Sequence, residues 1–232
     1  MSNVLIKYND PDWTGISVIG KLPPVSVSPS TTNQLVEFTG TNTASRFVGN
    51  SDATKIFGIT LGWIRSTAVT ATIDGNAMTV VAAPIVTSGS TTIGTAIAYR
   101  SFSSGPNATI AITFSSSLAI ANAAFWIVTN GSSVQDTITV SSSAIATISS
   151  SLDLIKEGGA LGVAVAETSS NPMIWTTLVE VNDRAAAGTL FRFSDAGLSG
   201  TSITATATAT VSADTGVVDY KSLTAVSFSV PG

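Results

Sequence analysis

The segment TSITATATATV (residues 201–211) alternates apolar and hydroxyl-bearing side chains one by one. In an extended strand, one face would carry Ile203, Ala205, Ala207, Ala209 and Val211. A period of two is typical of a β-strand with one buried face, whereas an amphipathic helix needs a period of about 3.6. The same period recurs from Gln34 onward and helical spacing is nearly absent, so the sequence predicts an all-β protein.

The segment VTATIDGNAMTVVAA (residues 69–83) predicts a β-hairpin. Apolar residues alternate with threonines up to the pair Asp74-Gly75, which tolerates the positive φ of a tight turn, and the alternation then resumes. Further strands are predicted at Ile56 to Ile64, Ile93 to Arg100, Ala108 to Phe114, Ala119 to Thr129, Ala144 to Ser149, Gly159 to Glu167, Leu178 to Val181, Gly188 to Ser194 and Val217 to Val230. Short polar clusters such as TSGST, SSGPN and TNGSS separate them, as turns do.

About ten strands joined by short turns predict an antiparallel sandwich of two sheets, because a sheet with one apolar face must bury that face against another layer. A jelly roll is the expected topology. The segment SLDLIKEGG (residues 151–159) has some helical character, and we expect only a short connection between the sheets there. Residues 31–232 are therefore assigned to one jelly-roll-like sandwich domain.

Residues 1–30 are predicted to form a separate, extended N-terminal arm. Pro23, Pro24 and Pro29 lie among serines and threonines, which favours an extended spacer that neither enters the core nor donates hydrogen bonds to a sheet. Before the spacer, apolar residues alternate on both sides of a predicted turn at NDPDWTG. The residues expected to bind a partner are Val4, Ile6, Tyr8, Trp13, Ile16, Val18 and Ile19. Two alternatives remain open: the arm folds back as an edge strand of its own sandwich, or it docks on a neighbouring subunit.

Composition limits the possible partners. Charged residues make up 10% of the chain, the formal net charge is −4, and Lys and Arg number 10 in all. Nucleic acid is therefore not an expected partner, because its binding depends on basic residues that neutralise phosphates. The longest dense apolar stretch, Ala119 to Val128, is about half of the roughly 20 residues needed to cross a bilayer, so no membrane partner is expected. Cysteine is absent and the first residues lack the apolar segment of a signal peptide, so assembly in a cytoplasm is expected.

Histidine and cysteine are both absent, which excludes the catalytic triads that depend on them and the common zinc sites. The remaining catalytic option is a pair of carboxylates of the glycosidase type. The candidates for it are Glu167, Glu180 and Asp183. They fall at or near the ends of predicted strands, where solvated carboxylates are ordinary, so no catalytic residue is assigned. Oxygen-rich loops at residues 50–54 and around Asp214 and Asp219 lack the ligand spacing of a calcium loop, so no metal or other cofactor is predicted.

Tryptophans could form a carbohydrate platform, since aromatic faces stack on sugars. Trp126 lies in a continuous apolar run and Trp63 lies in ITLGWI, so both are predicted to be core residues. Trp175, in NPMIWTT, is predicted to lie on a loop and is the candidate for contact with a glycan. The threonine face of residues 201–211 is expected to be an ordinary exposed sheet face, because one strand does not make the flat array of an ice-binding surface.

Four segments follow one another in the first part of the chain: VTATIDGNAMTVV, AIAYR, SSGPNATIAITFS and AIANAAFWIVTNGSS. Together with GGALGVAVAE, IWTTLVEV and KSLTAVSFSV further along, they resemble a sandwich module that is found in structural proteins of tailed bacteriophages. The resemblance covers about residues 56–230 and implies a component of the virion. The arm is not part of that module, and it is therefore expected to decide where the module is mounted.

The resemblance implies a non-enzymatic virion structural protein, with a capsid decoration or head-fibre protein favoured. The arm would attach it to the major capsid protein or another virion protein, and a homo-oligomer would be assembled on the particle in the host cytoplasm. A tail or baseplate component is the alternative within this class. Two alternatives come from other classes: a carbohydrate-binding module that recognises host surface glycans through Trp175, and a polysaccharide-cleaving tail enzyme, which would need its carboxylates to converge in a groove.

Overall fold

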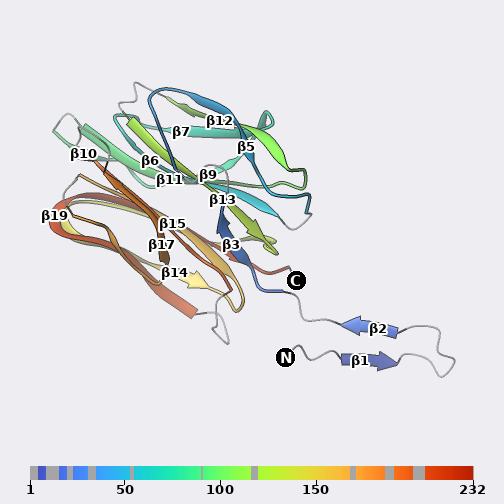
Figure 1. Cartoon of the computed structure of the whole chain (residues 1–232). Coiled ribbons are helices and arrows are strands. Elements are labelled where there is room, and N and C mark those ends of the chain that lie inside the picture. Colours follow the sequence, from blue (N-terminus) through green and yellow to red (C-terminus); the bar gives the residue numbers. More distant parts are fainter. Residues whose placement is uncertain are drawn as a thin grey trace.

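The computed structural model describes residues 5–8, 16–19, 23–30, 35–52, 55–89, 91–115, 120–167, 171–185, 191–200 and 207–231, and of residues 5–8, 16–19, 35–36 and 88 it describes the backbone alone. These residues form strands and turns, and the strands pair antiparallel (Figure 1). None of them belongs to a helix of the length and apolarity that a membrane crossing requires. The all-β prediction is confirmed.

Seven strands form a central sheet with the order β10-β11-β6-β13-β3, in which β9 also pairs with β11 and β4 also pairs with β13. Their bounds are β3 (Ser26–Pro29), β4 (Leu35–Phe38), β6 (Ile56–Ile64), β9 (Thr79–Ala82), β10 (Val86–Ser88), β11 (Thr91–Ser101) and β13 (Ile120–Thr129). A small outer sheet with the order β5-β12-β7-β8 packs on one face of the central sheet. Its strands are β5 (Asn42–Phe47), β7 (Val69–Ile73), β8 (Asn76–Ala77) and β12 (Asn107–Phe114).

The predicted hairpin is formed by β7 and β8. Asp74 and Gly75 join the two strands with φ angles of 47° and 76°, which this pair of residues adopts at little cost. Oδ1 of Asp74 also accepts a hydrogen bond from the backbone N of Thr109 (2.7 Å), which attaches the turn to β12. The hairpin prediction is confirmed for residues 69–77, whereas Thr79–Ala82, predicted to continue its second strand, form β9 and pair with β11 of the central sheet.

Strand β6 is buried along its whole length. Phe57, Ile59 and Leu61 belong to the core that lies between the central sheet and the small outer sheet. Ile56 and Ile64 point the other way, into a second core. A strand that is buried on both faces lies in a middle layer, so the central sheet must be covered on its other face as well.

A third sheet, called here the folded sheet, provides that cover (Figure 1). Its order is β14-β19-β15-β18-β17, and β16 pairs with β19. Its strands are β14 (Ser133–Leu154), β15 (Gly159–Ala166), β16 (Ile174–Thr176), β17 (Val179–Ala185), β18 (Arg192–Leu198) and β19 (Ala207–Ser229). The second core joins Ile97 and Trp126 of the central sheet to Leu161 and Phe193 of the folded sheet. For the body of the chain the sequence predicts two sheets, whereas the described residues between 23 and 231 form three, because the central sheet is covered on both faces.

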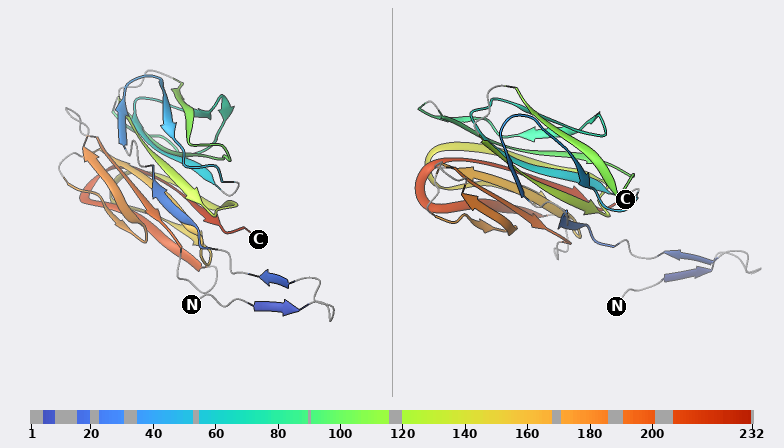
Figure 2. Two further views of the ribbon diagram at one scale, coloured as in Figure 1. Left: turned by 45° about the vertical axis from the view of Figure 1, so that its right-hand side comes forward. Right: turned by 45° about the horizontal axis from the view of Figure 1, so that its top comes forward.

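Strands β14 and β19 pair along their length and double back together, as the right-hand view of Figure 2 shows. Their ladder becomes irregular where Ala144 and Gly216 have φ angles of 55° and 70°. Beyond the bend, the backbone N of Asp153 donates to Oδ2 of Asp136 on the same strand (2.8 Å). A third core closes between the two layers of this folded ribbon. Residues 151–159, expected to be a short connection with some helical character, instead supply the end of β14 and the turn into β15.

The chain repeats one strand order. In the N-terminal half (residues 23–130) the sheets read β9-β11-β6-β13-β4 and β5-β12-β7. In the C-terminal half (residues 131–231) the inner layer reads β17-β18-β15-β19-β14, and the outer layer joins the far ends of β14 and β19 to β16. The short strands β3, β8 and β10 are left out, and each folded strand is counted once in each layer. The remaining strands of each half, numbered in chain order, then read 5-6-3-8-1 and 2-7-4. The single sandwich predicted for the body of the chain is therefore two sandwiches in tandem, packed through their larger sheets.

Candidate functional site

The predicted arm contains a two-stranded hairpin of β1 (Leu5–Tyr8) and β2 (Ile16–Ile19). Figures 1 and 2 show this hairpin lying away from the two sandwiches. Within the described ranges, β1 and β2 pair with each other and with no other strand. Among the described residues, the hairpin is therefore a separate two-stranded sheet.

The register of the hairpin sorts the predicted arm residues onto two faces. Ile6 lies opposite Val18 and Tyr8 lies opposite Ile16, and residues two apart on a strand share a face. Four apolar residues therefore share one face: Ile6, Tyr8, Ile16 and Val18. The other face carries Leu5 opposite Ile19. The remaining two predicted residues, Val4 and Trp13, lie outside the described residues.

The arm joins the body through β3, an edge strand of the central sheet. Strand β3 pairs with β13, and Pro29 lies opposite Trp126. A proline is tolerated at this place because it ends an edge strand. The next residue, Ser30, donates from its backbone N to O of Phe125 (2.8 Å) and from its hydroxyl to O of Phe47 (2.8 Å).

The same segment is also bonded to the C-terminal half. Val25 is 1% exposed, its N donates to O of Glu157 (2.8 Å), and its O accepts from N of Gly200 (2.9 Å). The backbone N of Val27 donates to Oγ of Ser199 (2.7 Å), and this hydroxyl donates back to O of Val27 (2.9 Å). The contacts of Val25 and Val27 with Glu157, Ser199 and Gly200 join the two halves of the chain. We call this line of contacts the seam, and β3 lies in it.

The spacer prediction is wrong for residues 25–30, which enter both a sheet and a core. The physical reason is visible in the sequence, because Val25 and Val27 alternate with serines as strand residues do. The C-terminal half leaves room for them at Gly159, where a Cβ would come within 2.8 Å of both valine side chains. The end of the predicted arm thus lies in the seam, and the hairpin precedes it in the chain.

Two of the three carboxylate candidates, Glu180 and Asp183, lie together on β17 beside Trp175. Nε1 of Trp175 donates to Oγ of Ser194 (2.7 Å), and this hydroxyl lies 2.9 Å from O of Asn182 and 3.4 Å from Oε2 of Glu180. Burial raises the pKa of Glu180, the charge of Asp183 raises it further, and the Ser194 hydroxyl opposes both. The pKa of Glu180 therefore lies above the ordinary value for a glutamate.

Asp183 is engaged by other groups. Its Oδ1 accepts from Nε of Arg192 (2.5 Å), and its Oδ2 accepts from Nη2 of Arg192 (2.7 Å) and from the backbone N of Met173 (2.9 Å). A bidentate guanidinium neutralises the carboxylate and fixes its orientation. These contacts give Asp183 a structural role. Asp183 is therefore not available as the second carboxylate of a catalytic pair with Glu180.

Glu167 lies apart from the other two candidates. Glu180 is opposite Ala196, which is opposite Gly162 of β15. Glu167 lies past the end of β15, roughly 17 Å from the level of Gly162 when about 3.4 Å is counted for each residue. The three carboxylates therefore do not converge in one groove.

The tryptophan predictions have mixed outcomes. Trp63 and Trp126 are each 1% exposed and are core residues, as predicted. The loop position predicted for Trp175 is wrong, because this residue lies in β16 opposite Ala213. Its ring covers Gly162, where a Cβ would come within 2.8 Å of the indole. Contact of Trp175 with a glycan stays a prediction, but part of the ring already packs against the sheet at Gly162.

At the start of the loop at residues 50–54, the carbonyls of Gly49 and Asn50 face a lysine. Lys55 is 1% exposed, and its Nζ donates to O of Gly49 (3.3 Å), Asn50 (2.8 Å) and Ser104 (2.6 Å). Residues 53 and 54 lie outside the described residues. The ammonium takes the place that a cation would need in this loop.

The second oxygen-rich segment is arranged in a similar way. Oδ1 of Asp214 accepts from the backbone N of Gly216 (2.7 Å), and Asp219 is paired with Lys221. Among the residues that the structure describes, no three of His, Cys, Asp and Glu come together as metal ligands would. Both segments therefore use their oxygens for internal hydrogen bonds.

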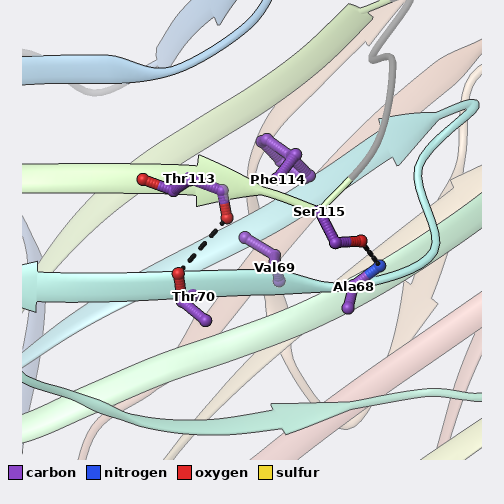
Figure 3. A pocket seen from close by; sticks show the side chains of 6 residues that line it. All are labelled: Ala68, Val69, Thr70, Thr113, Phe114 and Ser115. Atoms are coloured by element: carbon purple, nitrogen blue, oxygen red, sulfur yellow. Dashed lines mark hydrogen bonds between the residues drawn. The ribbon is translucent and has the colours of Figure 1, made fainter.

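A shallow hollow of about 90 Å³ lies where β7 begins and β12 ends (Figure 3). It is lined by Ala68, Val69, Thr70, Thr113, Phe114 and Ser115. Hydrogen bonds from Thr70 Oγ1 to Thr113 O (3.5 Å) and from Ala68 N to Ser115 Oγ (3.1 Å) use the polar groups of its walls. The hollow is smaller than ligand pockets of about 300 Å³ or more, and its lining residues offer no acid or base.

Comparison of the sequence with protein families, with curated proteins and with solved structures finds no match. The features that bear on function are therefore the hairpin and its connection to the seam through β3.

Proposed function

We propose that the protein is a non-enzymatic structural component of a bacteriophage virion, a capsid decoration or head-fibre protein mounted through its N-terminal hairpin. The major capsid protein or another virion protein would receive the hairpin, and several copies would occupy the particle. The observation that carries the proposal is the apolar face of Ile6, Tyr8, Ile16 and Val18. No described strand of the two sandwiches pairs with the hairpin that bears it.

We also propose that each half is a jelly roll, so that the body is a tandem jelly roll with an extended arm. The support is the order 5-6-3-8-1 over 2-7-4, which is expected when two Greek keys are rolled together. The fifth strand departs from this scheme, since β8 pairs with β7 and β9 then pairs with β11. Viral capsid proteins and lectins both use jelly rolls, which favours the virion setting and keeps glycan recognition as the alternative.

Docking of the hairpin would combine apolar burial with main-chain hydrogen bonds at the edge of a partner sheet. Burial of about 400 Å² of apolar surface contributes about 10 kcal/mol at about 25 cal/mol per Å², before the cost of association is subtracted. Repetition on a symmetric shell adds avidity. Because β3 is bonded to both halves, the docked hairpin would hold the whole body.

A co-sedimentation experiment tests the mounting role. The full chain is compared with a chain that begins at Pro23, which loses the hairpin and keeps β3. We expect only the full chain to sediment with particles that lack this protein. A full-length variant with Tyr8→Asp and Val18→Asp, on the apolar face, should fail to bind, whereas the matched variant with Lys7→Asp and Ser17→Asp, on the opposite face, should bind normally.

Equal binding by both chains would place the contact on the sandwiches and contradict the proposal. Binding of neither chain to particles, together with binding of the full chain to host surface glycans, would support the carbohydrate-binding alternative. The same assay with tailless heads and with isolated tails separates a head protein from a tail or baseplate component.

A further inference from the structure

A carboxyl group lies buried between the two sandwiches. Asp195, on β18, has 0% of its surface exposed, and its neighbours on the same face, Phe193 and Gly197, pack against the central sheet. A buried carboxylate is costly unless a cation or several hydrogen bonds compensate for its lost hydration. The side chains that hydrogen-bond Asp195 are uncharged, and they come from both halves.

The hydrogen bonds of Asp195 form a chain across the interface. Nε1 of Trp126 donates to Oγ1 of Thr60 (3.1 Å), and the Thr60 hydroxyl lies 2.9 Å from Oδ2 of Asp195. From the other side, the backbone N and Nδ2 of Asn182 donate to Oδ1 (3.1 and 2.8 Å). Trp126 and Thr60 belong to the central sheet and Asn182 belongs to β17, so the carboxyl group links the two sandwiches.

Charged side chains that face the central sheet from β17 lie at the rim of the interface. Arg184, two residues past Asn182 on β17, has Nη2 3.6 Å from Oε2 of Glu37 on β4, and the two side chains are 46% and 26% exposed. Glu180 and Asp183 of β17 lie toward Ser194 and Arg192, away from Asp195. Over their lengths β6 and β13 of the central sheet, and β15 beside β18, contribute no ionisable side chain to this face.

The hydroxyl of Thr60 can serve both protonation states of the carboxyl group. When Asp195 is ionised, Thr60 donates to it; when Asp195 is protonated, its O–H donates to Thr60, whose own hydrogen can turn to O of Ala124 (3.4 Å). The hydrogen bonds are therefore satisfied in both protonation states. The two states differ in free energy because only the ionised one has a buried charge. Burial raises the pKa of Asp195 from its ordinary 3.8 to about 7, against the opposing effect of the hydrogen bonds from Asn182 and Thr60.

We propose that Asp195 makes the contact between the two sandwiches pH-dependent, so that the halves hold together tightly while its carboxyl group is protonated and separate more readily once it is ionised. Separation returns the group to water and to its ordinary pKa. Between about pH 4 and about pH 7 the closed state binds more protons, so closure weakens as the pH rises through this window. From about pH 5 to about pH 8 the opening constant should rise roughly 100-fold. The proposal does not depend on what the hairpin binds.

Amide hydrogen exchange of the full chain tests this proposal. The reporters are the amides of Val25 and Gly200, whose hydrogen bonds cross between the halves, and the references are amides of β12 in the small outer sheet. After correction for the intrinsic effect of pH, we expect reporter exchange relative to the references to rise roughly 100-fold from about pH 5 to about pH 8. In Asp195→Asn, which keeps the shape and stays neutral, the ratio should not change with pH. The matched variant Asp153→Asn, in the folded ribbon, should keep the wild-type rise.

An unchanging ratio in the wild-type chain, or an equal rise in Asp195→Asn, would overturn the proposal. If Asp195→Asn does not fold, the carbon-13 resonance of the Asp195 carboxyl group in the wild-type chain decides the matter. Titration of that resonance near pH 7 is expected, and titration near pH 4 would overturn the proposal.

Discussion

Lysine is seldom buried, yet Lys55 and Lys221 are among the largest fully buried side chains of the described residues. An ammonium group has three hydrogens to donate, and each of these two finds three oxygen acceptors. Burial lowers the pKa of Lys55, and the charge of Asp52 raises it. Lys55 holds the backbone at Gly49 and Asn50 to the loop that contains Ser104.

Replacement of Lys55 by Met keeps most of the packing volume but leaves three carbonyls without their donor. We expect the free energy of unfolding to fall by about 3 kcal/mol, measured by urea denaturation. The matched variant Lys156→Met, at an exposed position, should change it by less than about 0.5 kcal/mol. Equal midpoints for the two variants would show that the carbonyl contacts of Lys55 do not stabilise the fold.

The sequence identifies Trp63 and Trp126 as core residues because both stand in apolar runs. It does not identify the place of Trp175 or the interface role of Asp195, since each depends on partners that are distant along the chain. Thr60, for example, is 135 residues from Asp195. A signal for Asp195 is nevertheless present, because in FRFSDAGL (residues 191–198) it occupies the inward position that follows two alternating phenylalanines.

The folded ribbon is the element that departs most from expectation. Strands β14 and β19 have 22 and 23 residues, whereas typical strands have about 5 or 6. Period-two alternation predicts strands in both regions, but only in separate pieces, and it cannot reveal the bend. At the bend, Nζ of Lys221 donates to O of Ile145 (2.8 Å), to O of Val217 (2.9 Å) and to Asp219.

In Lys221→Met, Asp219 loses the cation that faces it. Burial raises the pKa of Asp219 and Lys221 lowers it, so removal of Lys221 should raise this pKa further. We expect a loss of about 3 kcal/mol in the free energy of unfolding at neutral pH, with a smaller loss in acid, where Asp219 is protonated. The double variant Lys221→Met with Asp219→Asn should recover part of the loss in urea denaturation. Absence of any recovery would argue against a buried unpaired charge as the cause.

At the scale of the whole molecule, the three-sheet arrangement has a signal in the sequence. The runs IFGITLGWI, IANAAFWIVT and GALGVAVA form β6, β13 and β15, and almost every residue in them is buried. Continuous apolar runs, unlike alternating ones, are typical of strands that are covered on both faces. The runs thus favour an extra layer, but the order of strands could not be predicted, because it depends on pairing between distant segments.

Gly62 allows the larger sheets of the two sandwiches to approach each other. A Cβ at this position would lie 2.4 Å from Val165 and 2.8 Å from Phe193. We expect Gly62→Val to lower the free energy of unfolding by about 2 to 3 kcal/mol and to split the calorimetric transition, as the halves lose their contact. Ala111→Val, on β12, is the matched control and should unfold like the wild type. An unshifted single transition for Gly62→Val would mean that the sheets do not meet there as described.

The hydrogen bonds that β3 makes on both of its sides have a mechanical consequence. A tensile load on a docked hairpin reaches the body along the axis of β3. Hydrogen bonds of an antiparallel pair run across the strands, so such a load shears them side by side instead of peeling them one at a time. The bonds to β13 on one flank, and to Glu157, Ser199 and Gly200 on the other, must then fail together. Strand β3 would therefore pass a load on the hairpin to both halves of the body at once.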